Sequence, residues 1–354
     1  MNVISIAVTG ASGLVGQRLL PMLADDPSVS RVVGLDMRPP RRRSRGLEFH
    51  LVDVARAELK PLLEGIDVLV HLASVVDPIP DETLMAHVNV NGTRRVLDAA
   101  AAVGVQRLVR VSSATVYGAW ANNPVPLTEE SPLRPNTGFS PAVQAAEVER
   151  LLAEWRDDHP GVVVTTLRAA PVLGPGAERL PSRILLGRPS VRVRGARPPV
   201  QAVHIDDLVG ALGMVVLADY PGTFNVASDG WLDHEEARRL LAPSRIPPLP
   251  AGLLERVLRV TWEIGVGDVP PGVVPYLTHP TVIANDRLRG IGWRPRHDNE
   301  EAVVDGLDSL GPPLSKVRWV ALAAGAAAGA AATAWLLGRR WRRGARRATR
   351  PTPG

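Results

Sequence analysis

Short apolar, β-branched runs recur along the first half of the chain, separated by segments of helix-forming composition. Helices are expected from near Leu14, over 85–102 and over 141–155. Strands are expected over 4–8, 31–35, 49–54, 67–73, 106–111 and 162–167. Strands that alternate with helices in this way predict an α/β fold with a Rossmann-type, doubly wound parallel sheet, in which ligands bind at the carboxyl ends of the strands.

A glycine-rich turn directly follows the first predicted strand. Its spacing is G-x-x-G-x-x-G: Gly10 permits a sharp turn, Gly13 a close approach to a pyrophosphate, and Gly16 close packing of the helix on the strand. Free N–H groups at the start of that helix favour an anion. We therefore expect a dinucleotide to contact Gly10, Ser12, Gly13, Leu14, Val15 and Gly16.

The second predicted strand ends in Asp36. A carboxylate at this position can accept hydrogen bonds from both hydroxyls of an adenosine ribose, which favours NAD over NADP. The run that follows either pairs with the 2′-phosphate of NADP or is a solvated loop, and Arg38 is the member expected to contact the cofactor. The arginines of this run are Arg38, Arg41, Arg42, Arg43 and Arg45.

Further cofactor contacts are expected where later strands end. Asp53 and Val54 close the third predicted strand, where they would meet the adenine ring. The fourth strand ends in small residues that allow a nicotinamide ribose to approach closely, and Asn89 lies near the start of the next helix. The residues expected to make these later contacts are Leu72, Ala73, Ser74 and Asn89.

Composition narrows the classes of function. The 354-residue chain has no cysteine, which excludes disulfides, thiolate metal sites and a cysteine nucleophile, and no metal site is predicted. The net charge of +5 arises in residues 316–354, which hold nine Lys/Arg and no acid, so the remainder carries a net charge of −4. No nucleic acid partner is expected, because the body lacks a basic patch with interleaved aromatics. The first residues do not resemble a signal peptide, which predicts a cytoplasmic nucleotide domain.

Taken together, the motifs resemble those of the extended short-chain dehydrogenases/reductases in the NAD-dependent epimerase/dehydratase family, whose best-known members act on nucleotide sugars. The resemblance implies a Rossmann domain over 1–171 and a smaller, discontinuous substrate domain over 172–312, interleaved with Rossmann elements at about 201–228. It also implies NAD, a nucleotide-sugar substrate and a homodimer. The matching segments are 9–16, Asp36, 53–54, 71–74, 89–93, 111–118, 167–168, 174–175, 203–208, 224–226 and 288–295.

The catalytic residues of the family are only partly present. The family uses a serine or threonine together with a tyrosine and a lysine in a Y-x-x-x-K arrangement, and Ser113 matches the hydroxyl. On the following helix, one alignment places Pro141 and Ala145 in the tyrosine and lysine positions, and another places Phe139 and Val143 there. Because no lysine occurs between Lys60 and Lys316, neither alignment supplies the pair.

Other polar residues are weighed as substitutes. Tyr117 is expected to line the substrate side of the pocket and is a weak candidate for the lost acid/base. His71 is predicted to be structural. The His204 motif is predicted to be a strand-to-helix junction, with Asp207 suited to an N-cap. Pro171 replaces an asparagine that contacts substrate in nucleotide-sugar enzymes, which weakens that substrate assignment.

An alanine-rich segment, uncharged over 319–338, lies near the C-terminus at 317–338, and a basic tail follows at 339–354. Trp319 and Trp341 would be about 33 Å apart along a helix, close to the roughly 30 Å thickness of the hydrocarbon core. A membrane-spanning helix, a helix on the membrane surface and a soluble alanine-rich helix all remain open. The first two predict a cytoplasmic domain attached to the cell membrane.

Two functions therefore remain. The first is an NAD-binding nucleotide-sugar epimerase or oxidoreductase with a degenerate Tyr-x-x-x-Lys site. The second is a non-catalytic NAD-binding regulatory or scaffolding protein at the membrane. An NADP-dependent reductase that uses the arginine-rich run is a weaker third hypothesis.

Overall fold

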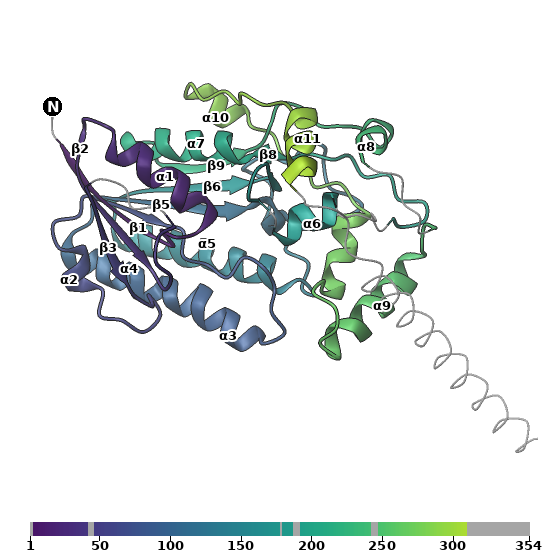
Figure 1. Ribbon diagram of the computed structural model, residues 1–354, viewed down its shortest axis with the longest axis horizontal. Helices are drawn as coiled ribbons and strands as arrows, with labels where there is room; N and C mark the ends of the chain where they lie inside the picture. Colours follow the sequence, from purple (N-terminus) through teal and green to yellow (C-terminus); the bar gives the residue numbers. More distant parts are fainter. Residues whose placement is uncertain (1–2, 42–45, 178, 187–191, 242–246, 310–354) are drawn as a thin grey trace, which may run out of the picture.

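The computed structural model describes residues 3–41, 46–177, 179–186, 192–241 and 247–309. The main sheet has seven parallel strands in the order β3-β2-β1-β4-β5-β6-β9 (Figure 1). The order reverses between β1 and β4, which opens a crevice at the carboxyl ends of these strands. The predicted doubly wound sheet is confirmed. Its strands are β1 (Ile4–Thr9), β2 (Val29–Asp36), β3 (Leu47–Leu51), β4 (Val68–His71), β5 (Arg107–Ser113), β6 (Val163–Ala169) and β9 (Gly222–Val226).

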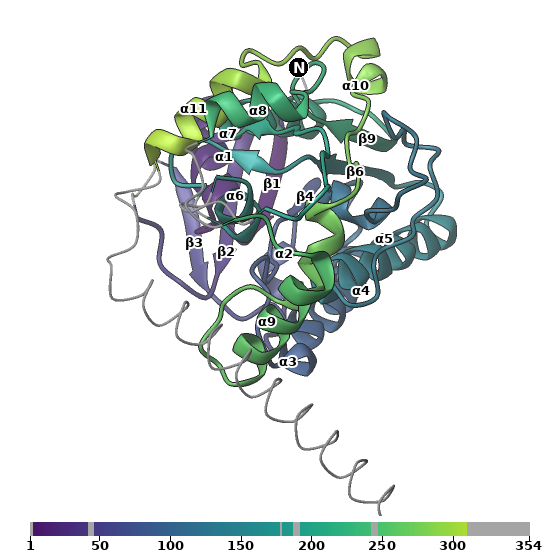
Figure 2. The same cartoon turned by 90° about the vertical axis from the view of Figure 1, so that its right-hand side faces the viewer.

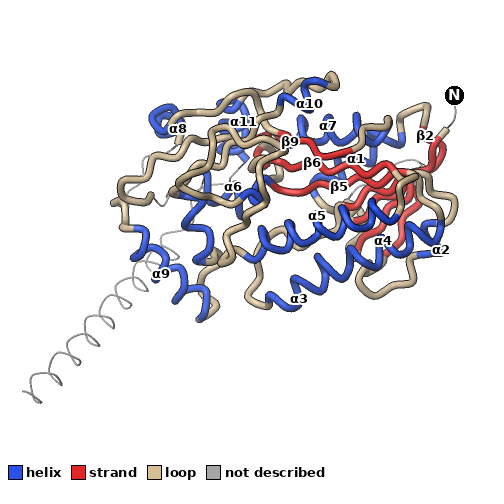
Figure 3. The backbone as a smooth tube through the Cα atoms, turned by 180° about the vertical axis from the view of Figure 1, so that it is seen from behind, coloured by secondary structure: helices blue, strands red, loops and turns tan. Residues whose placement is uncertain are grey.

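Helices cover both faces of the sheet (Figures 1 and 3). One face packs against α1 (Leu14–Ala24) and α7 (Ile205–Leu217). The other packs against α2 (Lys60–Leu63), α4 (Gly92–Val103) and α5 (Ser140–Asp158). Central strands such as β4 are therefore buried on both sides, which explains their continuous apolar sequence.

A second group of elements lies beyond the carboxyl ends of the strands (Figures 1 and 2). Within it, α11 packs against α6 and against the two-stranded sheet β7–β8. Of the elements in this group, β7, α6 and α8 contribute residues that line the crevice. The group consists of β7 (Val172–Leu173), α6 (Leu180–Leu186), β8 (Val203–His204), α8 (His234–Leu240), α9 (Ala251–Glu263) and α11 (Asn299–Ser309), while α10 (Asp286–Gly290) lies beside β9.

Two predicted elements differ from those observed. The third strand ends at Leu51, so Asp53 and Val54 lie in the turn that follows it. The helix expected over 85–102 consists of α3 (Glu82–Ala86), a π-helical turn over His87–Asn91 and α4. The wide π turn is a local irregularity that apolar periodicity does not reveal, and it carries Asn89.

No helix in the described part of the chain is long and apolar enough to cross a membrane. The predicted segment 317–338 and the basic tail 339–354 lie outside the described residues.

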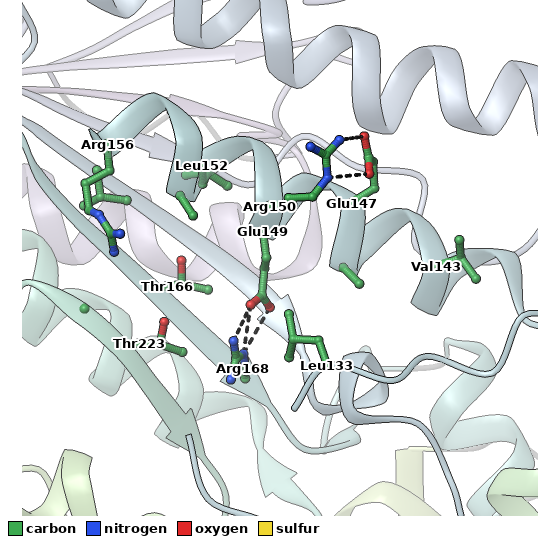
Figure 4. A pocket seen from close by; sticks show the side chains of 14 residues that line it. Leu133, Val143, Glu147, Glu149, Arg150, Leu152, Arg156, Thr166, Arg168 and Thr223 are labelled. Atoms are coloured by element: carbon green, nitrogen blue, oxygen red, sulfur yellow. Dashed lines mark hydrogen bonds and ion pairs between the residues drawn. The ribbon is translucent and has the colours of Figure 1, made fainter. Parts of the chain in front are cut away.

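A buried ion pair ties α5 to the sheet. Glu149 of α5 faces Arg168 of β6 (Figure 4), whose Nη2 and Nε lie 2.6 and 2.9 Å from Glu149 Oε2. Ser112 Oγ donates to Glu149 Oε1 at 2.5 Å. The side chains of Glu149 and Arg168 are 6% and 8% exposed, so each charge depends on the other for the solvation that water would otherwise provide.

We expect Glu149→Gln to lower the free energy of unfolding by about 3 to 5 kcal/mol, because it leaves the Arg168 guanidinium buried without its counter-charge. Glu147→Gln, which breaks the exposed pair with Arg150 on the same helix, is the control and should cost less than about 1 kcal/mol. Urea unfolding of both variants measures the difference. Equal losses would contradict the importance of the buried pair.

Candidate functional site: the crevice between β1 and β4

The glycine turn packs so closely against neighbouring backbone that residues with a Cβ would not fit at Gly10 or Gly16. Gly10 has a φ of +68°, and a Cβ on it would lie 2.6 Å from the carbonyl carbon of Leu72. A Cβ on Gly16 would lie 2.7 Å from the Gly10 carbonyl oxygen. Gly13 is the N-cap of α1 and offers no side chain to the amides that begin at Leu14. These first amides remain available to an anion in the crevice.

Asp36 is fixed at the end of β2 by backbone amides. Its Oδ2 accepts from Ser12 N at 3.0 Å and its Oδ1 accepts from Arg38 N at 2.9 Å. Each carboxylate oxygen keeps a further lone pair, which suits the two hydroxyls of a ribose. The Arg38 side chain is 66% exposed, with its Nε 3.8 Å from Asp36 Oδ1, and extends mainly into solvent.

A cavity of about 820 Å³ runs along the carboxyl ends of the strands. It continues past the start of α5 to the elements beyond the sheet. The structure thus brings nearly all of the predicted site residues around one space. The predicted residues that line it are Gly10, Gly13, Leu14, Val15, Gly16, Asp36, Arg38, Asp53, Val54, Leu72, Ala73, Ser74, Asn89 and Ser113.

Two predicted site residues lie outside the lining. Ser12 instead positions Asp36 and donates from its Oγ to the Arg38 carbonyl at 2.6 Å. Tyr117 has no exposed surface: its hydroxyl donates to Asn225 Oδ1 and accepts from Arg168 Nη1, both at 2.8 Å. The expectation that Tyr117 lines the substrate side of the pocket is wrong, because these two buried partners hold the phenol inside the core.

Ser113 ends β5 at the cavity wall. Its Oγ accepts from Thr115 Oγ1 at 2.9 Å and from Thr115 N at 3.2 Å. A hydroxyl that accepts two hydrogen bonds still has its own hydrogen to donate. Ser113 can therefore donate to an oxygen of a bound ligand.

Asn89 joins the π turn to the end of β4 and to α5. Its Oδ1 accepts from Val75 N at 2.7 Å and from Ser74 Oγ at 3.2 Å. Its Nδ2 donates to Gln144 Oε1 at 2.9 Å and to the Val75 carbonyl at 3.2 Å. With these contacts, Asn89 mainly positions the cavity wall.

The start of α5 brings no proton-exchanging group to the cavity. Phe139, Pro141 and Ala145 line it there. A phenol that sequence reasoning missed, Tyr276, also lines the cavity. Its ring centroid lies 5.2 Å from that of Phe139, and its hydroxyl donates to the Thr115 carbonyl at 3.0 Å. Burial raises the pKa of Tyr276 strongly, so it remains protonated. Tyr276 lies far from Ser113 and Phe139 in the sequence, so no local motif predicts that it lines the cavity.

Arg110 is a second lining residue that the sequence analysis did not identify. It lies within β5, and its side chain is buried. A charged residue between the apolar residues at the centre of a buried strand is unusual, and that pattern could have identified Arg110.

The His204 motif forms a structural junction, as predicted, but the capping residue differs. His204 Nδ1 accepts from Asp206 N at 3.2 Å and caps α7. Asp207 does not cap the helix. It is buried, and its two oxygens accept from Arg296 N and His297 N at 2.9 and 3.0 Å, which holds a distant loop.

His204, His297 and Asp305 place potential metal-binding atoms within 4.8 Å of one another. The two imidazole rings lie against each other, with centroids 3.9 Å apart and planes tilted by 31°. Moreover, His204 Nδ1 accepts a hydrogen bond, which leaves the proton of the neutral ring on Nε2. The geometry favours a structural cluster.

His71 is structural, as predicted. Its Nε2 is 2.9 Å from Thr93 Oγ1, which itself donates to the Asn89 carbonyl, so the ring hydrogen lies on Nε2. Nδ1 then accepts from Thr9 Oγ1 at 2.8 Å. Burial, together with the nearby charge of Arg110, lowers the pKa of His71 to about 3.

A glycine turn, an acid at the end of β2 and a crevice at the strand-order reversal are together typical of a dinucleotide-binding α/β protein. Residues 6–227 match the NAD dependent epimerase/dehydratase family, and the chain belongs to it.

Three similar proteins illustrate this family. An uncharacterized protein of Mycobacterium tuberculosis is 28% identical over 91% of this chain and 89% of its own length. The 3-diazoavenalumate denitrifying reductase of a Streptomyces species is 32% identical over 82% of this chain and 96% of its own. The UDP-glucose 4-epimerase of Thermus thermophilus, solved in complex with NAD, has a TM-score of 0.67 and 21% identity, over 86% of this chain and 98% of that one.

The lowered pKa of His71 predicts a stability that depends on pH. In the folded protein the pKa of His71 is about 3, below the usual 6.5. The contribution of His71 to the free energy of unfolding is therefore complete above pH 6.5 and is lost as the pH falls toward 3. Between pH 7.5 and 5 it should decrease by about 2 kcal/mol. Chemical unfolding of the wild type and of His71→Gln at both pH values isolates the pH-dependent contribution of His71. An identical pH dependence in the two proteins would contradict a neutral, buried His71.

Proposed function

We propose that this protein is an NAD(H)-dependent oxidoreductase that works without the Tyr-x-x-x-Lys pair of its family. The arrangement around Asp36 carries the proposal, since two backbone amides hold its carboxylate at the cavity wall beside the glycine turn. The adenosine ribose would bind there, and the pyrophosphate would meet the first amides of α1. Asp53 and Val54 would flank the adenine.

Asp36 favours NAD over NADP. A 2′-phosphate would lie against a carboxylate that is only 9% exposed, and repulsion between two anions in such a site is costly. Arg38 does not remove this conflict, because its side chain extends mainly into solvent.

The chemistry follows from what the cavity contains. Bound NADH would supply a hydride. Ser113 would donate a hydrogen bond to the substrate atom that gains negative charge, while the α5 residues Phe139, Pro141 and Ala145 cannot exchange a proton. Epimerisation and dehydration in this family depend on removing a proton from the substrate and returning one. A reduction only adds one hydride and then takes up one proton, which solvent water would supply to the oxygen that gains negative charge. The reductase from Streptomyces, 32% identical to this chain, supports the same choice.

The far end of the cavity suits an anionic substrate. Arg179, Arg192 and Arg238 line it. Arg179 and Arg238 pair with Asp77 and Glu235, whereas Arg192 Nε is buried without a hydrogen-bond partner among the described residues. One guanidinium group can donate two parallel hydrogen bonds to two oxygens of the same phosphate. A nucleotide-diphosphate sugar, the kind of substrate named for the Thermus epimerase, has the charge that this end requires.

Asp36→Asn tests the cofactor assignment. Losing the charged acceptor should weaken NAD binding by about ten- to a hundredfold, since a hydrogen bond to a charged group is worth about 1.5 to 3 kcal/mol. Asp98→Asn, an exposed change on α4 outside the cavity lining, is the control and should leave affinity unchanged. Calorimetric titration measures both. An unchanged NAD affinity in Asp36→Asn would refute the proposed ribose contact.

A non-catalytic NAD-binding scaffold at the membrane is the second candidate, and the α5 residues that line the cavity favour it. Its membrane part rests on the sequence of 317–338. A chain that ends at residue 312 should then leave the membrane fraction, and this truncated chain should bind NAD as before. Unchanged sedimentation of the truncated chain with membranes would refute the attachment. NADH oxidation by any sugar nucleotide would exclude the non-catalytic function.

A further inference from the structure

Arg110 carries a positive charge that no residue in the described part of the chain pairs with directly. Its side chain is buried, and the residue is 5% exposed. Its Nε has no hydrogen-bond partner, and no hydrogen bond or ion pair reaches the guanidinium from any residue that the structure describes. An isolated buried cation is costly, so a group that persists in this state is expected to act on something that enters from outside.

The nearby carboxylate is already occupied. Glu149 interacts electrostatically with Arg110, but its oxygens are held by Arg168 and Ser112, at 2.6 and 2.5 Å. Figure 4 shows Glu149 directed toward Arg168. Two buried arginines therefore share one buried carboxylate on this face of the sheet, and one positive charge remains.

The residual charge lies on the floor of the cavity. Arg110 pairs in register with His71, and neighbouring residues of parallel strands direct their side chains to the same face, here toward the π turn and α5. Arg110 lines the cavity together with Asn89, Gln144 and Ala145. Its field also acts on His71, whose pKa it helps to lower.

A dinucleotide in the crevice would extend toward this charge. With its adenosine ribose at Asp36 and its pyrophosphate at the glycine turn, its second half would lie across the ends of β4 and β5. The oxidised nicotinamide ring carries a positive charge that the reduced ring lacks. An uncompensated guanidinium below that region repels the oxidised form selectively.

Resting on the proposed function, we propose that Arg110 makes the cavity select the reduced cofactor. The site binds NADH more tightly than NAD⁺, because only the oxidised ring adds a second positive charge to a poorly solvated space. A preference of about tenfold is expected for two charges several ångströms apart in a partly buried site. Such a preference suits a protein that delivers a hydride.

The test compares the affinities of the full-length chain for NADH and NAD⁺. Wild type should prefer NADH by at least about tenfold, and Arg110→Met should bring the ratio close to one. Arg110→Lys, which retains the charge, should keep most of the preference. Arg107→Met is the matched control, since Arg107 lies on the same strand but pairs with Asp219 and does not line the cavity.

Thermal unfolding provides a second readout. Removing an unpaired buried charge should leave the melting temperature of Arg110→Met equal to or above that of wild type, whereas a purely structural arginine would lower it. An unchanged NADH preference in a folded Arg110→Met overturns the inference and leaves the proposed function intact. If wild type binds neither dinucleotide, both fail.

Discussion

The close approach of Gly10 to the backbone after β4 is the constraint on which the site depends. At this point the connections that follow the parallel strands β1 and β4 lead to opposite sides of the sheet, and only a residue without a Cβ fits between the turn and the Leu72 carbonyl. The contact fixes where α1 begins, and thereby where its first amides point. Asp36, on the neighbouring strand, is then held by the amide of Ser12 in the same turn. The position of the Asp36 carboxylate, on which the proposed preference for NAD rests, is thus set by backbone geometry.

The side of the cavity next to α5 is built differently. Helix α5 is joined to β5 and β6 through Glu149, but the side chains that it presents to the cavity, Pro141, Gln144 and Ala145, do not exchange protons. The polar chemistry of this region comes instead from Ser113, from the cavity floor at Arg110 and from Tyr276 on a distant segment.

Local sequence was sufficient for the parts of the site that a single turn or strand end creates. The glycine spacing, Asp36 and the small residues after β4 all lie where their motifs predict, because a parallel sheet brings its carboxyl ends together. Tyr117 and Asp207 were misjudged, because their partners, Asn225 and the backbone at 296–297, are remote in the chain. Tyr276 was missed for the same reason, and the π turn because it has no distinctive periodicity.

The most direct test of the account is a crystal structure of the protein with NADH. The account predicts ribose hydroxyls within hydrogen-bond distance of Asp36, the pyrophosphate at the first amides of α1, and the nicotinamide above the ends of β4 and β5. A dinucleotide bound elsewhere, or a crevice that stays free of NADH at saturating concentration, would contradict it.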